Sequence, residues 1–122
     1  MSQVRVLVVD DQEPFRRAMA AVVEATDGFT VVGAAATGEE SLAAVATLRP
    51  ALVLMDVHLP GISGVEAAGR MRAADGAGPV VVLLSTYDED EFDSSGAGAA
   101  AYVSKASFSS ERLEQVWRES TG

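Results

Sequence analysis

The hydrophobic positions of the chain fall into short runs separated by stretches of helical spacing. The runs are almost continuously apolar and do not alternate with polar residues, which is typical of strands covered on both faces. The predicted strands lie within residues 4–11, 30–36, 51–56, 79–85 and 100–104.

Between these runs the apolar residues recur at the spacing of amphipathic helices. One helix begins near Pro14, which is favoured in a first turn, and is predicted to carry Phe15, Met19, Val22 and Val23 on one side. Other helical patterns span residues 37–50, 63–74 and 109–120.

The second helical pattern has recognisable ends. Thr37 is a candidate N-cap with Glu40 three residues later, the spacing of a capping box, and Pro50 is expected to end the helix. The alternation of strands and helices predicts an α/β fold in one domain over residues 1–122, with a parallel sheet covered by helices on both faces.

Residues 87–100 do not fit this regular pattern. They hold five acidic residues and two glycines in the place where a fourth helix is expected. We therefore expect that helix to be short or mobile.

Composition limits the classes of function. The chain has no cysteine, and 18 acidic residues against 9 basic ones give a net charge of −9, which argues against direct binding to a nucleic-acid backbone. Its N-terminal apolar run is too short for a signal peptide or a membrane span, so we expect a cytoplasmic protein without membrane contact.

Polar residues stand at the carboxyl ends of the predicted strands, where open parallel sheets bind ligands. They are Asp10 and Asp11 after the first strand, Asp56 after the third, Ser85 and Thr86 after the fourth, and Lys105 after the fifth. Each alone has a simpler explanation, such as a turn, a cap or a solvated side chain. Their joint occurrence predicts one site.

The residue types at this site indicate phosphoryl chemistry. Clustered carboxylates with room for water suit Mg²⁺, and a carboxylate beside Mg²⁺ can attack a phosphoryl group to form an acyl phosphate. Lys105 and Ser85 could contact oxygens of that group.

Other motifs are rejected. The G-x-G-x-x-A run at residues 96–101 precedes a strand instead of following one, so it is not a dinucleotide site. A phosphatase of the haloacid-dehalogenase type needs a second aspartate two residues after the nucleophile, but position 58 is histidine and position 12 is glutamine. A lone His58 does not make a zinc site.

Taken together, these residues resemble the receiver domain of bacterial two-component response regulators. The motifs are the acidic pair, Asp56 with Pro60 and Gly64 at D-x-x-x-P-x-x-x-G spacing, and the hydroxyl and lysine after the last two strands. Local segments such as "VVDDQEPFRRAM" and "STYDEDEF" look most like the corresponding segments of receivers that precede a LuxR-type helix-turn-helix.

The resemblance implies a doubly wound, flavodoxin-like sheet of order 2-1-3-4-5, with two helices on one face and three on the other. It implies that Asp56 accepts a phosphoryl group from a sensor histidine kinase. Mg²⁺ (or Mn²⁺) would be bound by Asp11, Asp56 and the backbone carbonyl of His58, with Asp10 supporting it through water. The chain would catalyse its own phosphorylation and slow hydrolysis, and would not be a conventional enzyme.

The same resemblance assigns a switch and tuning positions. Ser85 would turn toward the phosphoryl group while the ring of Tyr102 moves inward; the alternative for Tyr102 is a half-buried strand aromatic. His58, Thr86 and Tyr87 would tune dephosphorylation, or be loop residues without kinetic effect. Signalling would change the surface formed by the fourth helix, the fifth strand and the last helix, allow a homodimer, and control transcription.

Two departures from the family pattern concern that surface and the lysine. Ser85 and Lys105 are 20 residues apart, about two fewer than is usual in the family, and the deletion falls in the acidic segment. Many receivers have a cis proline after the lysine, but here Ala106 follows. A cis bond there would cost about 2.5–4 kcal/mol, so either a trans bond or strain is expected.

The altered segment keeps an alternative hypothesis open, namely a receiver-fold interaction module that works without phosphorylation. The residues "RESTG" at the end of the sequence could open a linker or be a free tail. The chain could be a stand-alone receiver or part of a longer regulator, and DNA would be contacted only through an output domain beyond this chain.

Overall fold

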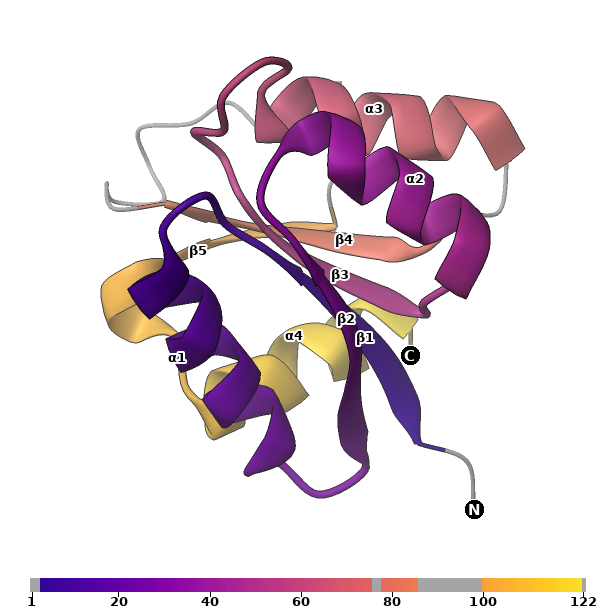
Figure 1. The fold of residues 1–122 in the computed structure, drawn as a ribbon. Helices are drawn as coiled ribbons and strands as arrows, with labels where there is room; N and C mark the ends of the chain where they lie inside the picture. Colours follow the sequence, from indigo (N-terminus) through magenta and orange to yellow (C-terminus); the bar gives the residue numbers. More distant parts are fainter. Residues whose placement is uncertain (1–2, 76–77, 86–99, 122) are drawn as a thin grey trace.

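The computed structural model describes residues 3–75, 78–85 and 100–121, and Figure 1 draws them as a ribbon. Five parallel strands form one sheet of order β2-β1-β3-β4-β5, as the family resemblance implies. The strands are β1 (Val4–Val9), β2 (Phe29–Ala35), β3 (Leu52–Asp56), β4 (Val80–Ser85) and β5 (Ala101–Ser104).

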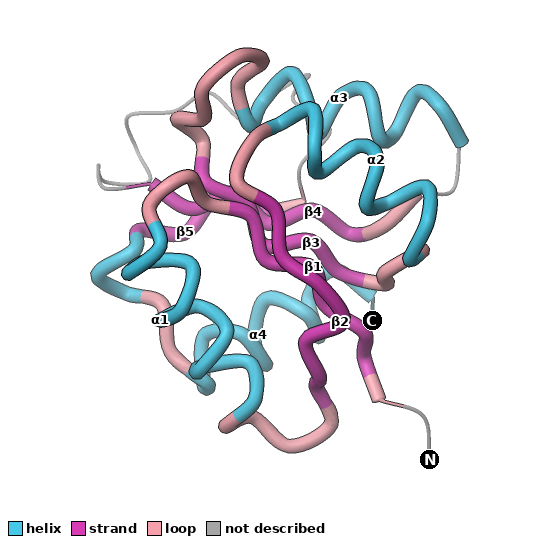
Figure 2. The backbone as a smooth tube through the Cα atoms, viewed as in Figure 1, coloured by secondary structure: helices cyan, strands magenta, loops and turns pink. Residues whose placement is uncertain are grey.

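Helices cover both faces of the sheet, as Figures 1 and 2 show. Helices α1 (Glu13–Glu24) and α4 (Ser110–Thr121) lie on one face, and α2 (Gly38–Leu48) and α3 (Gly64–Asp75) lie on the other. A single 3₁₀ turn, η2 (Lys105–Ser107), connects β5 to α4. The place expected for a short or mobile further helix, residues 87–100, lies almost entirely outside the described residues, so the expected two-and-three division of helices stays a prediction.

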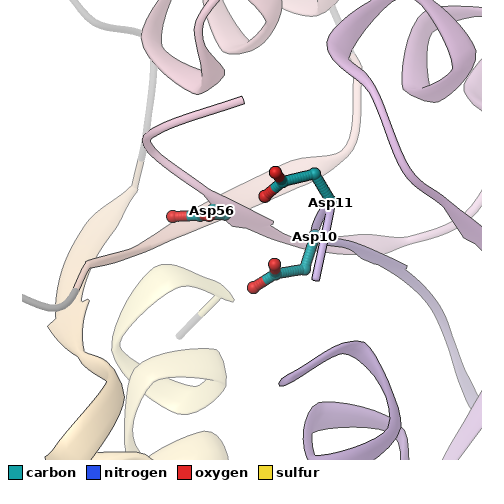
Figure 3. Close-up of side chains that lie close together, drawn as sticks. All are labelled: Asp10, Asp11 and Asp56. Atoms are coloured by element: carbon teal, nitrogen blue, oxygen red, sulfur yellow. The ribbon is translucent and has the colours of Figure 1, made fainter. Parts of the chain in front are cut away.

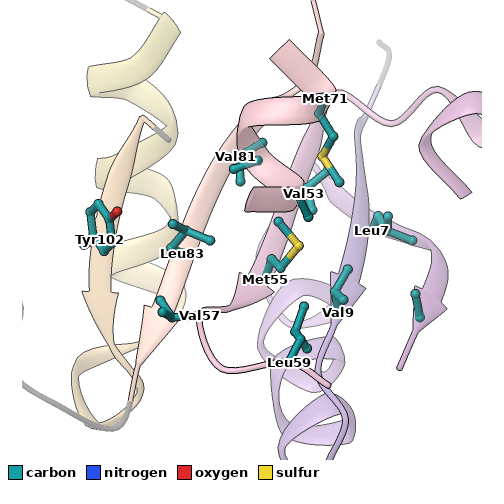
Figure 4. Close-up of a cluster of buried hydrophobic side chains, with 13 residues drawn as sticks. Leu7, Val9, Val53, Met55, Val57, Leu59, Met71, Val81, Leu83 and Tyr102 are labelled. Carbon is teal, nitrogen blue, oxygen red and sulfur yellow. The ribbon is translucent and has the colours of Figure 1, made fainter. Parts of the chain in front are cut away.

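The sheet separates two hydrophobic clusters. The cluster under α2 and α3 includes Leu7, Val53, Met55 and Leu83 from the strands and extends to Tyr102 on β5 (Figure 4). The strand residues between these positions face α1 and α4 instead, because successive side chains of a strand point to opposite faces. The continuous apolar runs in the sequence are explained by this double coverage.

Edge strand β2 and helix α4 meet at the amino-terminal side of the sheet. Phe29 begins β2 and pairs in register with Val4, and its ring packs edge-to-face on Trp117 of α4. The ring centroids are 6.3 Å apart and the planes cross at 81°. This aromatic pair fixes α4 against the start of the sheet.

The helix ends confirm the local signals for α2. The Thr37 hydroxyl accepts a hydrogen bond from the backbone N–H of Glu40 at 3.0 Å, and the Glu40 carboxylate accepts one from the N–H of Ala36 at 3.2 Å. The helix ends at Leu48, and Arg49 follows in a left-handed conformation directly before Pro50. The predicted cap and stop are therefore both correct.

The peptide bond after Lys105 has ordinary geometry. No cis peptide bond occurs in the described ranges, so the bond between Lys105 and Ala106 is trans.

Met19 and Val23 of α1 are buried as predicted, but Phe15 is 39% exposed and does not belong to the core. Its position in the first turn carries it past the edge of the sheet, where the acidic residues lie.

Candidate functional site

The carboxylates predicted to converge do lie together. Asp10 and Asp11 follow β1 directly, and Asp56 ends the neighbouring strand β3. One carboxylate oxygen from each residue lies within 4.8 Å of the other two, and Figure 3 shows the side chains projecting into the same space. Asp10 and Asp56 are buried, whereas Asp11 is exposed.

Lys105, directly after β5, completes the cluster. Its ammonium lies 2.9 Å from Oδ2 of Asp10 and 3.5 Å from Oδ2 of Asp56, and its side chain is only 10% exposed. The 3₁₀ turn that begins at Lys105 is capped by the Ser104 hydroxyl, which accepts a hydrogen bond from the N–H of Ala106 at 3.2 Å. The cap fixes the direction in which the chain leaves β5, and with it the origin of the lysine side chain.

Each buried aspartate also accepts a hydrogen bond from its own loop. Oδ1 of Asp10 accepts the N–H of Gln12 at 2.9 Å, and Oδ1 of Asp56 accepts the N–H of His58 at 3.2 Å. Such bonds to a residue two positions on are typical of aspartate at turns. They leave the Oδ2 atoms for Lys105, so each carboxylate is held at both oxygens.

Helix α1 secures the loop of Asp10 from the outside. Nη1 of Arg16, one turn into the helix, donates to the backbone carbonyl of Asp10 at 2.8 Å. No local sequence pattern predicts this contact, because an arginine on a helix surface is ordinarily solvated.

Close packing fixes the loop after β3. Gly64, the first residue of α3, donates its N–H to the carbonyl of Val57 at 2.9 Å. A Cβ atom at this position would lie 2.2 Å from the carbonyl oxygen of Asp56. Only glycine allows the helix to begin this close to the aspartate, which gives a physical reason for the glycine of the D-x-x-x-P-x-x-x-G spacing.

The environment of Asp56 shifts its proton affinity. Burial raises the pKa of the Asp56 carboxyl above its ordinary value, and this effect outweighs the opposing influence of the Lys105 charge and the His58 N–H. The nearby Asp10 charge adds a further, smaller rise in the pKa.

The remaining predicted residues lie around this cluster or outside the description. Ser85 is buried at the end of β4, one position beyond the register partner of Asp56. Tyr102 is buried on β5 opposite Leu83, so by strand alternation Ser85 and Tyr102 belong to the same face of the sheet. His58 is exposed. Thr86 and Tyr87 lie outside the described residues.

Phe15 is a further residue at the cluster that was not predicted from the sequence. The Phe15 ring, whose spacing to Met19 indicated a core position, has its centroid 4.1 Å from Nζ of Lys105. The two residues are 90 positions apart in the chain, and no local pattern signals that contact.

A cavity of about 470 Å³ lies elsewhere, between α2 and α3. Its lining is mostly apolar, with Arg49 and Arg70 at its border, and it contains none of the aspartates or Lys105. Size alone therefore does not identify the chemical site, and the convergent charged groups at the strand ends do so better.

The arrangement can hold a cation and present a carboxylate for reaction. Three carboxylates supply an all-oxygen donor set that could bind a metal ion, and such a set fits the hard divalent cations.

Among the described helices, none combines the length and the apolar character required to cross a membrane.

Comparison with known proteins agrees with this geometry. The family model of the response regulator receiver domain matches residues 6–118. The chain belongs to this family. Receiver domains are parts of two-component response regulators, which accords with the motifs identified from the sequence.

Several similar proteins are regulators by name. The chain is 38% identical over 115 residues to response regulator GacA of Pseudomonas protegens, covering 93% of this chain and 54% of that protein. It is 32% identical over 120 residues to transcriptional regulatory protein LiaR of Bacillus subtilis, covering 98% of this chain and 57% of that protein. The chain therefore spans about half the length of the curated relatives it matches.

A solved structure extends the similarity to the whole fold. The signal receiver domain of NarL from Mycobacterium tuberculosis superposes with a TM-score of 0.89 at 28% sequence identity. The match covers 100% of this chain and 99% of that one.

Proposed function

We propose that this receiver domain is a phosphorylatable switch in which Asp56 accepts a phosphoryl group from a histidine of a sensor kinase. The observation that carries the proposal is the placement of Asp56, whose side chain is 8% exposed and lies 3.5 Å from the ammonium of Lys105 beside two further carboxylates. Family membership supports the same role.

In the proposed transfer, a carboxylate oxygen of Asp56 attacks the phosphorus of a phosphohistidine. The new O–P bond forms as the P–N bond breaks, and the electron pair of that bond stays on the imidazole nitrogen. Lys105 pairs with one phosphoryl oxygen and the hydroxyl of Ser85 donates to another. In hydrolysis, water attacks the phosphorus, and the acyl phosphate separates into the carboxylate and inorganic phosphate.

Asp10, Asp11, Asp56 and the backbone carbonyl of His58 would hold Mg²⁺ or Mn²⁺, which when bound neutralises and orients the carboxylate and phosphoryl oxygens. The all-oxygen donor set supports this assignment. The exposed position of Asp11 leaves room for the water ligands that Mg²⁺ usually keeps.

The proposed output is a change on the side of β5. Ser85 and Tyr102 belong to one face of adjacent strands, so a movement of the Ser85 side chain toward the phosphoryl group opens space that the Tyr102 ring can enter. The surface that responds would consist of β5, α4 and the segment before β5. His58, Thr86 and Tyr87 would set how long the phosphoryl group survives. Control of transcription is proposed from the names of the relatives.

The test is intact-protein mass after incubation with Mg²⁺ and acetyl phosphate, followed by a cognate kinase if the small donor fails. The wild type should gain one phosphoryl group and lose this gain in EDTA, whereas Asp56→Asn should gain none. Asp27→Asn, which changes an exposed aspartate between α1 and β2, is the matched control and should react like the wild type. No gain with either donor would contradict the proposal and favour the interaction module that works without phosphorylation.

A further inference from the structure

The first turn of α1 exposes a large apolar side chain beside the acidic cluster. Within the described residues, Phe15 is the single large hydrophobic side chain that is exposed, at 39%. Exposing a phenylalanine gains nothing for the core, since Met19 and Val23 of the same helix already fill it. The Phe15 ring is therefore available for a contact outside the core.

The Phe15 ring contacts Lys105. The Lys105 ammonium stands over the Phe15 ring, 4.1 Å from its centroid, well within the range of a cation–π interaction. Among the described residues, the ion pairs of this ammonium are with the carboxylates of Asp10 at 2.9 Å and Asp56 at 3.5 Å. The cation is thus enclosed between two negative groups and the electron-rich face of a ring.

We propose that Phe15 is a positioning residue that holds the Lys105 ammonium at the phosphoacceptor and keeps water from it. This inference rests on the proposed phosphorylation of Asp56. It assigns to an exposed residue of α1 a part in the chemistry that occurs at the end of β3.

Packing does not enclose the lysine side chain on every side. The side chain of Lys105 borders a cavity of about 80 Å³, together with Phe15, Met19, Leu84 and Phe108. A flexible lysine chain beside such a space has room to change its path. Among the described residues, the ammonium itself is held by its ion pairs and by its contact with the ring.

Loss of the ring should consequently reduce the reaction and not only the stability. An ammonium that escapes into water is no longer in place when negative charge moves onto the phosphoryl oxygens. A cation–π contact of ordinary strength corresponds to a change in rate of about threefold to tenfold.

The experiment is stepwise fluorination of Phe15 by site-specific incorporation of mono-, di- and trifluorophenylalanine. Fluorine withdraws electrons from the face of the ring and changes its shape little. We expect the rate of phosphorylation by acetyl phosphate with Mg²⁺ to fall with each fluorine, to a total of about threefold to tenfold. The same series at Phe108, which borders the cavity, should leave the rate unchanged.

Simple substitutions give a second measurement. Phe15→Leu should slow phosphorylation by a similar factor. Phe15→Trp should keep the wild-type rate, because tryptophan offers a stronger cation–π face. Thermal unfolding of each variant separates this effect from a loss of fold.

Three results would overturn the inference. The first is an equal rate across the fluorinated series. The second is a loss seen only with the kinase and not with acetyl phosphate, which would make Phe15 a partner contact. The third is an unmodified protein that accepts no phosphoryl group from either donor, which would remove the proposed function and this inference together.

Discussion

The loops that follow β1 and β3 each hold a buried aspartate but differ in length. Each places a buried aspartate whose Oδ1 atom accepts the N–H two residues later and whose Oδ2 atom faces Lys105. Three residues, 10–12, then lead directly into α1, whereas seven residues, 57–63, separate β3 from α3.

The difference decides how accessible each carboxylate is. The short loop and Arg16 enclose Asp10 completely, and its distance to Lys105 is the shorter of the two, at 2.9 Å. The longer loop leaves the Asp56 side chain 8% exposed and its ion pair looser, at 3.5 Å. The same turn hydrogen bond thus accompanies a fully enclosed partner of the lysine after β1 and a slightly exposed carboxylate at the end of β3.

Removing the shared cation tests this comparison most strongly. Lys105→Met leaves both buried carboxylates without their ion pair, and we expect a loss of about 3–5 kcal/mol in the free energy of unfolding at neutral pH. Urea denaturation followed by circular dichroism measures the loss.

The two aspartates should respond differently when each is replaced by asparagine in the Lys105→Met background. Asp10→Asn in the Lys105→Met background should recover more stability than Asp56→Asn, since Asp10 is fully buried. Equal recovery would mean that the two aspartates are energetically alike and that the distinction drawn from the loops is wrong.

The glycine at the end of the longer loop offers a second test. Gly64→Ala should cost about 3 kcal/mol of unfolding free energy, because the new methyl group meets the rigid carbonyl of Asp56. It should also slow phosphorylation, since relief of the clash displaces the acceptor. Urea denaturation and intact mass give the two readings.

Gly28→Ala is the matched control for this change. Gly28 has a φ of +88° and nothing within 4 Å of an added Cβ, so only backbone strain of about 1 kcal/mol is expected and phosphorylation should be unaffected. An equal loss of stability in both variants would show that the close approach of Gly64 is not what constrains the loop.

The smallest expected effect concerns pH. The pKa of Asp56 is raised in the folded protein, so its contribution to stability is fully present below the unfolded value of 3.8 and is lost as pH rises through the folded value. In EDTA, Asp56→Asn should therefore be more stable than the wild type at pH 7, with the gain shrinking toward pH 4. Urea denaturation across this range measures it. A gain that grows with acidity would contradict the direction of the pKa shift.

Local signals made much of the molecule predictable. Continuous apolar runs indicated strands with two covered faces, and the Thr37 cap follows from hydrogen bonds within one helical turn. The acidic cluster was predictable because parallel strands bring their carboxyl ends to one edge, so that Asp10, Asp56 and Lys105 had to approach one another.

What the sequence did not reveal depends on contacts between distant segments. Phe15 has the spacing of a core residue, and only the placement of α1 at the end of the sheet takes its ring to Lys105. The contact of Arg16 with the Asp10 carbonyl likewise requires the helix to be docked. Patterns within one helix describe its own faces but not what each face meets.

The edge-to-face pair of Phe29 and Trp117 also has a practical consequence for spectroscopy. Trp117 is the sole tryptophan of the chain, and its partner Phe29 lies in register with Val4, six residues before Asp10. At the rise of a strand, this is about 20 Å from the acidic cluster. The intrinsic fluorescence of Trp117 should therefore report the loss of the fold. A paramagnetic ion such as Mn²⁺ bound at the aspartates should not quench this fluorescence by direct contact.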